Sequence, residues 1–389
     1  MSGINLAMRG AHAPNLGADG GSGGGTIDPI DHRPNDGSGI WPDSSNTGYQ
    51  NEPNWPGSFT GGTFGTSFTG WYDYSPTTGT TIYYAHFKGK IGIGYTSGDN
   101  LTFVGCLFEC GLGSGTGDCC YLYTNTKVTF KFCTWKPGAY GAPLGYVSGS
   151  SANTTDAASV DYGTNHVNSY EGPVTVAANA STGQNGNAQI IMDHCEWWGC
   201  GGGCQFGGGN VSAANPHTFT NNYIHDYADP WSTAGTTNGY HHDGIGPDSA
   251  GGDGYVLIDH NTIASMGNTN AIALQGNSYH NIIVTNNYIS GWGMQLSIGA
   301  SGNSAGDTNC IITDNITSGE LLGVNDTAYG GNGAFAPNYD ANLPGTAAGN
   351  TWRRNRWQVR SGDPSWSLAS HGQYWWPTDD NAHATDYTG

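Results

Sequence analysis

The chain has 389 residues and a formal net charge of −19, and 65 of its residues are glycine. Binding to nucleic acid or to an anionic membrane surface requires basic side chains, so we expect neither partner for such an acidic chain. No stretch approaches the roughly 20 apolar residues of a membrane-spanning helix, and no membrane insertion is expected. The N-terminus lacks a basic segment followed by an apolar one, so the sequence predicts no signal peptide.

Residues 1–78 are rich in Gly, Pro, Asn and Ser and show no lasting hydrophobic period. The segment nevertheless contains many aromatic residues, which is unlike the composition of a disordered tail. These residues are Trp41, Trp55, Phe59, Phe64, Phe68, Trp71, Tyr72 and Tyr74. We therefore predict an extended N-terminal arm, ordered by packing on the end of the following domain or on a partner.

A short pattern recurs across residues 79–360: an apolar residue precedes a central Asn or Cys by three positions, and another follows it by two, except in one copy, where Thr317 takes the second apolar place. The central residues of eight copies are Cys106, Cys133, Cys195, Asn222, Asn261, Asn287, Asn315 and Asn355. The shortest spacings between them are 26 to 28 residues, and the larger spacings contain insertions. Alternating apolar residues indicate β-strands, and a repeat of this length indicates a stacked architecture.

This pattern resembles the right-handed parallel β-helix superfamily, which includes pectate lyases, polygalacturonases and bacteriophage tail spikes. The resemblance implies an all-β fold, a right-handed parallel β-helix (solenoid) with coils of about 27 residues. It also implies that the central residues stack inside the helix. The expected amide ladder comprises Asn222, Asn261, Asn287 and Asn315. Cys106, Cys133 and Cys195 would occupy the same row as buried thiols.

Three insertions interrupt the predicted helix, at residues 137–188, 226–254 and 319–349. Loops of this length are usually functional or make oligomer contacts. Residues 361–389 contain several aromatic side chains and are expected to form an irregular C-terminal cap or tail.

The insertion at 226–254 contains the densest polar chemistry of the chain. Paired carboxylates can act as acid and base in glycoside cleavage, and a histidine can accept a proton near neutral pH. The candidate catalytic residues are Asp226, Asp229, His241, His242 and Asp243. Aromatic faces can bind neutral sugars by stacking. The candidate substrate-binding residues are Trp198, Tyr227, Trp231 and Tyr240. Asp243, Asp248 and Asp253 could hold Ca²⁺, since this ion takes carboxylate oxygens; no other cofactor is expected.

The same insertion also has a purely structural interpretation. The sequence 243–245 would occupy the place that 270–272 occupies in the next coil, as a turn leading into a strand. Of the polygalacturonase pattern, only the step from Asp243 to Gly244 is present. No Lys or Arg occurs from Pro137 through Trp352, so this region lacks the basic groups that eliminative cleavage of a polyuronate needs. An enzyme of this kind would therefore be a polysaccharide hydrolase rather than a lyase.

Three functions stay open at this point. The first is a bacteriophage virion protein of the minor tail or tail-spike kind that contacts a cell-surface polysaccharide. By analogy it would be a homotrimer attached to other tail or baseplate proteins, made in the host cytoplasm and extracellular when it acts. The second is a glycan-degrading enzyme that uses acids of residues 226–254. The third is a structural surface or decoration module without a ligand.

Overall fold

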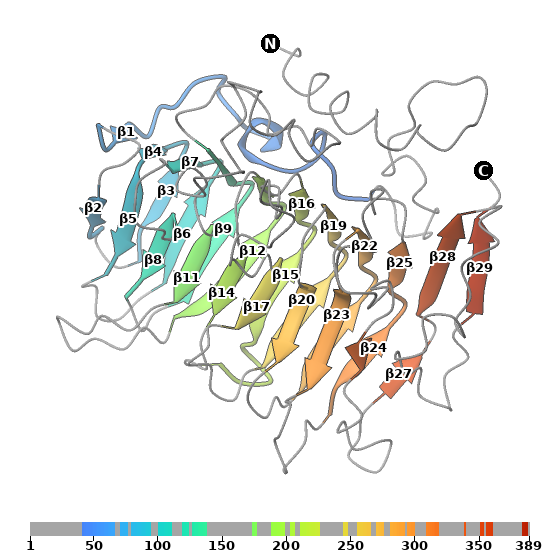
Figure 1. The fold of residues 1–389 in the computed structure, drawn as a ribbon. Coiled ribbons are helices and arrows are strands. Elements are labelled where there is room, and N and C mark those ends of the chain that lie inside the picture. The colour runs from blue at the N-terminus through green and yellow to red at the C-terminus, as the bar shows by residue number, and fades with distance from the viewer. Residues whose placement is uncertain are drawn as a thin grey trace, which may run out of the picture.

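The strands of this chain, seen in a computed structural model, form three long sheets in which every neighbouring pair is parallel (Figure 1). The structure describes residues 41–66, 71–76, 79–94, 100–110, 119–123, 127–137, 173–176, 188–198, 203–206, 211–225, 244–247, 255–265, 270–275, 281–291, 294–299, 309–318, 338–339, 351–353, 355–360 and 383–387. The fold is an all-β parallel β-helix, which confirms the prediction from the sequence. No helix in the described part of the chain is long and apolar enough to cross a membrane.

From β1 to β28 the chain visits the sheets in a fixed order, A then B then C, and the next described strand, β29, lies again in sheet A. Sheet A consists of β1 (Thr63–Phe64), β4 (His86–Lys88), β7 (Leu107–Cys110), β10 (Thr134–Pro137), β13 (Glu196–Trp198), β16 (Tyr223–His225), β19 (Thr262–Ser265), β22 (Tyr288–Gly291), β25 (Ile316–Ser318), β28 (Arg356–Arg360) and β29 (His383–Tyr387). Sheet B consists of β2 (Trp71–Tyr74), β5 (Lys90–Ile93), β8 (Cys120–Leu122), β11 (Val174–Val176), β14 (Cys204–Phe206), β17 (Ile245–Pro247), β20 (Asn270–Gln275), β23 (Met294–Gly299) and β26 (Asn338–Tyr339). Sheet C consists of β3 (Thr81–Tyr83), β6 (Leu101–Val104), β9 (Lys127–Lys131), β12 (Gln189–Asp193), β15 (His217–Thr220), β18 (Val256–Asp259), β21 (Ile282–Thr285), β24 (Ile311–Thr313) and β27 (Thr351–Arg353).

A two-residue corner joins each sheet C strand to the next sheet A strand. The first corner residue is left-handed in coil after coil, with φ between 50° and 61°, and it faces outward. These residues are Tyr84, Gly105, Phe132, His194, Asn221, His260, Asn286 and Asp314. Asn, Asp and His adopt this conformation more readily than most residues with a side chain. The stretch 256–263 is therefore divided at this corner between two strands in different sheets, β18 and β19.

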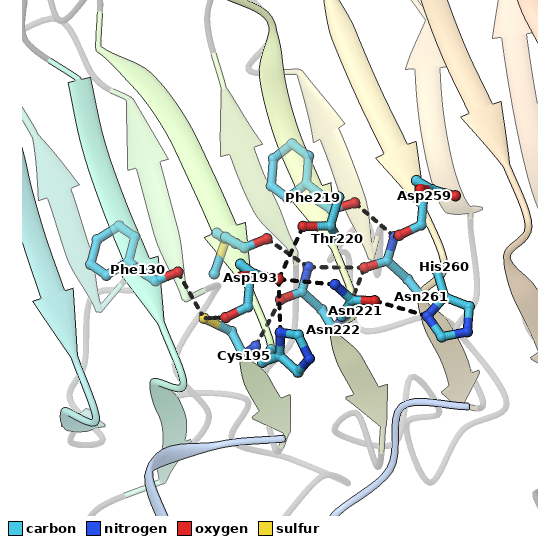
Figure 2. Close-up of polar contacts among 12 residues, drawn as sticks. Phe130, Asp193, Cys195, Phe219, Thr220, Asn221, Asn222, Asp259, His260 and Asn261 are labelled. Atoms are coloured by element: carbon cyan, nitrogen blue, oxygen red, sulfur yellow. Dashed lines mark hydrogen bonds and ion pairs between the residues drawn. The ribbon is translucent and has the colours of Figure 1, made fainter. Parts of the chain in front are cut away.

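The second corner residue points inward and forms the predicted ladder (Figure 2). Asn261 Nδ2 donates to Asn287 Oδ1 at 2.9 Å, and the same bond joins Asn222 to Asn261, Asn287 to Asn315 and Asn315 to Asn355, each at 2.9 Å. Each of these acceptor oxygens also accepts the backbone N–H of the preceding ladder residue. The ladder is fully buried, so its amides satisfy one another rather than water. It is thus confirmed, and Asn355 extends it.

Cysteines continue this row toward the N-terminus, as expected. Cys106, Cys133 and Cys195 are completely buried. The Cys195 backbone N–H donates to Asn222 Oδ1 at 2.9 Å, which joins the thiol and amide parts of the row. The Cys195 thiol donates to the carbonyl of Phe130 at 3.4 Å. Burial raises the pKa of the Cys133 thiol well above its usual value, and the neighbouring thiols act in the same direction, so this thiol is uncharged at neutral pH.

Aromatic rings stack along the inner face of sheet A in the first coils. The Phe87 and Phe108 rings lie 4.9 Å apart, and those of Phe108 and Trp135 lie 4.8 Å apart, nearly parallel in both cases. These distances match the spacing between neighbouring strands, so equivalent side chains of successive coils stack directly. Trp197 and Ile224 continue this buried row.

The described part of the arm packs along the side of the helix. In Figure 1 it is the blue segment that follows sheet A. Trp41 is buried, and its ring stacks at 5.2 Å on His260 and lies 5.9 Å from Tyr288. Further along, the Gly48 N–H donates to the His194 carbonyl at 2.9 Å. The arm therefore crosses several coils from the outside, rather than packing on the helix end.

Near its other end, the arm forms an aromatic cluster over the first coils. The Tyr49 ring, in a short 3-10 turn η2 (Tyr49–Asn51), lies 5.0 Å from Trp55 and 5.1 Å from Phe59. The Tyr84 hydroxyl donates to Glu52 Oε2 at 2.8 Å. After this cluster the chain enters β1 and β2, so residues 1–78 already contain the first strands of sheets A and B.

Candidate functional site

Three of the four longest connections between successive strands run from sheet A to sheet B. They are residues 138–173, 226–244 and 319–337, which follow β10, β16 and β25; the fourth, residues 361–382, joins β28 to β29 within sheet A. The predicted insertions were slightly too long, because each includes a sheet B strand: β11, β17 or β26. By contrast, the C-to-A corner is always two residues long. These three connections begin where a sheet A strand ends and finish where a sheet B strand begins, a boundary that we call the A–B edge.

A polar and aromatic cluster lies on the outer face of sheet A, where residues 226–244 begin. His225, the last residue of β16, places its Nε2 3.2 Å from Glu196 Oε1 on the neighbouring strand β13. The Tyr223 ring stacks on the His225 ring at a centroid distance of 3.9 Å. The Trp198 ring lies 6.5 Å from His225. Because strand residues alternate, these four side chains face outward while Trp197 and Ile224 face the core.

The cluster is well covered, because His225 is only 4% exposed and Tyr223 and Trp198 are 6% and 7% exposed. The arm contributes part of the cover. Tyr49 donates its backbone N–H to Thr134 Oγ1 at 3.1 Å, and that hydroxyl lies 3.4 Å from Glu196 Oε2. Burial raises the pKa of the Tyr49 hydroxyl; its bond from Gln50 acts in the opposite direction. The charges of Glu196 and Glu109 add to the raised pKa of Tyr49, which shows that this ring lies near both carboxylates.

A second acid group lies two strands away, on β7. Glu109 contacts His86 Nε2 at 2.6 Å and Lys136 Nζ at 3.1 Å. Burial alone would raise the pKa of Glu109, but the hydrogen bond from His86 and the charges of Lys136 and His86 outweigh it and lower the pKa below its usual value. Glu109 is therefore ionised and bonded to both His86 and Lys136, which is typical of a structural ion pair.

The Glu196–His225 pair is the group in this region with the clearest chemical capacity. An imidazole bonded to a carboxylate can take up or release a proton near neutral pH. The rings of Tyr223 and Trp198 pack beside the imidazole of this pair and shield it from water. Sequence reasoning missed Glu196 and His225. Aligning the outward positions of successive coils, one and three residues after each ladder residue, would have placed them side by side.

Most of the residues predicted for the site lie outside the described part of the chain. These are Asp226, Tyr227, Asp229, Trp231, Tyr240, His241, His242, Asp243, Asp248 and Asp253. Trp198 is described and belongs to the cluster. Among the described residues, no three His, Cys, Asp or Glu side chains come together as a metal site.

The turn interpretation of residues 243–245 is confirmed at its described end. Ile245 pairs with Ile272 in sheet B, and the Gly244 N–H donates to the Asn270 carbonyl at 2.9 Å. A side chain at position 244 would begin 2.4 Å from the Ala271 carbonyl oxygen, so the close approach of the two strands requires glycine. The Asp-Gly step thus has a structural reason that is independent of catalysis.

No family model matches the chain, and neither a curated protein nor a solved structure matches it. What it shares with other β-helix proteins is therefore the architecture of stacked parallel sheets.

Proposed function

We propose that this protein is a structural protein of a bacteriophage virion, of the minor tail or tail-spike kind, that contacts a cell-surface polysaccharide. The observation that carries the proposal is that three of the four longest connections in this parallel β-helix run from sheet A to sheet B. A solenoid presents such segments in a row at fixed spacing, which suits an extended ligand. The net charge of −19 favours neutral over anionic glycans.

The assembly we propose is a homotrimer attached to other tail or baseplate proteins. The protein would be made in the host cytoplasm and would act outside the cell. A trimer rests on analogy with β-helical spikes. Native mass spectrometry of the full chain tests it: a mass of three copies supports the trimer, and a monomer at micromolar concentration overturns it.

Binding is tested with an array of neutral and acidic bacterial cell-wall and capsular polysaccharides. We expect retention on one neutral polysaccharide class that is weakened by Trp198→Ala and unchanged by Asn54→Ala, an exposed position on the arm. Failure to bind every polysaccharide on the array would refute the proposal.

A second candidate function, glycan hydrolysis, is favoured by the Glu196–His225 pair at the root of the 226–254 insertion. Incubation with the same polysaccharides and measurement of new reducing ends tests this candidate. Glu196→Gln should abolish the activity, and the absence of reducing ends from any polysaccharide would rule it out. Ca²⁺ bound by Asp243, Asp248 and Asp253 stays a proposal, tested by whether a chelator lowers the melting temperature.

A further inference from the structure

Three aromatic rings meet on the outer face of sheet B, far from the Glu196–His225 pair. Trp71 lies on β2, Tyr121 on β8, and Tyr123 directly follows β8. The Trp71 ring is 5.2 Å from Tyr121 and 6.2 Å from Tyr123, and the two tyrosine rings are nearly parallel at 6.0 Å. We call these three rings the sheet B platform.

Glycines in the intervening strand allow the platform to form. β5 lies between β2 and β8, and two of its successive outward positions are Gly92 and, just after the strand, Gly94. A Cβ at Gly92 would lie 2.7 Å from Trp71 Cζ2, and one at Gly94 would lie 3.1 Å from Tyr123 Cβ. The indole therefore lies across the bare backbone of β5 and reaches the tyrosines beyond it.

Asp73 holds the indole in this position. Its Oδ1 accepts the Trp71 Nε1–H at 2.7 Å, and the carboxylate is exposed. Since Oδ1 is the atom that fixes the indole, Oδ2 can accept hydrogen bonds from a ligand. The orientation of the ring is thus set before any ligand arrives, which reduces the entropy lost on binding.

The helix itself does not need this ring, because Trp71 is 48% exposed. One indole face lies over Gly92, and the exposed remainder adjoins the half-buried rings of Tyr121 and Tyr123. Two strand spacings separate β2 from β8, so the platform is about 10 Å wide. That width fits a ligand with flat apolar faces.

Ring spacing discriminates between two kinds of ligand. Aromatic cages for quaternary ammonium groups surround the cation with separated rings. Here the rings contact one another at 5.2 to 6.2 Å, which leaves no room for a cation between them. A surface of touching rings beside a carboxylate acceptor instead suits a sugar, whose C–H face stacks on the rings while its hydroxyls donate to the acceptor.

We propose that the sheet B platform is a binding site for a neutral polysaccharide, with a pyranose ring stacked on Trp71 and a hydroxyl donating to Asp73 Oδ2. On this face Asp73 and Lys90, the strand partner of Trp71, have opposite charges, and the net charge of the whole chain disfavours an acidic sugar. The inference rests on the proposed function for its ligand class, but the site, on sheet B, contains none of the residues of the Glu196–His225 cluster on sheet A.

The test uses the full chain and soluble oligosaccharides of glucose, mannose, galactose and N-acetylglucosamine, with binding measured by titration calorimetry. Trp71→Ala should weaken binding of at least one oligosaccharide by roughly tenfold. Gly92→Ala should also weaken it, because the new Cβ displaces the indole without removing it. The matched control is Tyr83→Ala, which removes a 53% exposed ring from β3 in sheet C and should leave binding unchanged.

The outcomes separate this inference from the proposed function. If the unmodified protein binds an oligosaccharide and Trp71→Ala binds it equally well, the platform is not the site, while polysaccharide binding stands. If no oligosaccharide or polysaccharide binds, both proposals fail. Binding of choline or of oligogalacturonate in place of neutral sugars would overturn the ligand class. Melting temperatures within about 2 °C of the unmodified protein show that each variant is folded.

Discussion

Replacing Asn261, an interior amide of the ladder, should destabilise the protein more than any single exposed substitution. In Asn261→Ala, the N–H and Nδ2 of Asn222 lose the oxygen that accepts them, each at 2.9 Å. The lost Nδ2 no longer donates to Asn287 Oδ1, to the Phe219 carbonyl or to the Asp259 carbonyl. All of this occurs at a position that is fully buried.

The magnitude follows from which groups keep another partner. Asn222 Nδ2 still donates to the Met192 carbonyl at 3.1 Å, and Asn287 Oδ1 still accepts the backbone N–H of residue 261 at 3.0 Å. The Asn222 N–H and the Phe219 carbonyl lose the bonds that the ladder gave them. Each buried polar group left without a partner costs about 1–3 kcal/mol, and the cavity adds to this cost. We therefore expect a loss of about 4 kcal/mol in the free energy of unfolding.

Urea unfolding followed by circular dichroism measures this loss, with two further variants for comparison. Asn261→Leu fills a similar volume without the amide, so it separates lost hydrogen bonds from lost packing. It should be nearly as unstable as Asn261→Ala. Asn54→Ala, on the exposed surface of the arm, should stay within about 0.5 kcal/mol of the unmodified protein. If Asn261→Leu proved as stable as the unmodified protein, the claim that the ladder stabilises through its hydrogen bonds would be wrong.

Two further predictions concern Gly48 in the arm and the carboxylate of Asp193 at the end of β12. Gly48 and Gly57 both have φ of +77°, but a Cβ at Gly48 would lie 2.5 Å from Thr134 Oγ1, whereas nothing lies within 4 Å of one at Gly57. Gly48→Ala should therefore speed proteolysis within residues 41–60 more than Gly57→Ala does, and equal rates would contradict the described docking of the arm. Burial would raise the pKa of Asp193, but hydrogen bonds from His194, Asn221 and Thr220 outweigh it and lower the pKa. The ionised Asp193 carboxylate stabilises the fold above its ordinary pKa of about 3.9, and this stabilisation is lost as the pH falls through the lower pKa of the folded state. Asp193→Asn lacks this carboxylate. Its melting temperature should therefore fall less steeply below about pH 4 than that of the unmodified protein.

The sequence by itself determined the β-helix and its inner ladder. Each coil must place a small residue at the same inward corner, and this requirement repeats along the chain. Burial restricts those positions to a few residue types, so Asn222, Asn261 and Asn287 are visible as a period. The same restriction marks Cys195 as a member of the row.

The sequence did not determine which sheet each strand of a coil joins. Around Asn261 the inward positions are 256, 258, 261 and 263, and the extra residue between 258 and 261 includes the left-handed His260. Only the backbone conformation divides this stretch between two sheets.

Only the tertiary structure determined which outward-facing side chains of the β-helix are neighbours. Tyr49 and Thr134 are bonded across 85 positions, and His225 and Glu196 across 29. Outward-facing residues are not confined to apolar types by burial, so no period reveals them. Their neighbours depend on the length of every insertion between successive coils, and that register exists only once the coils have stacked.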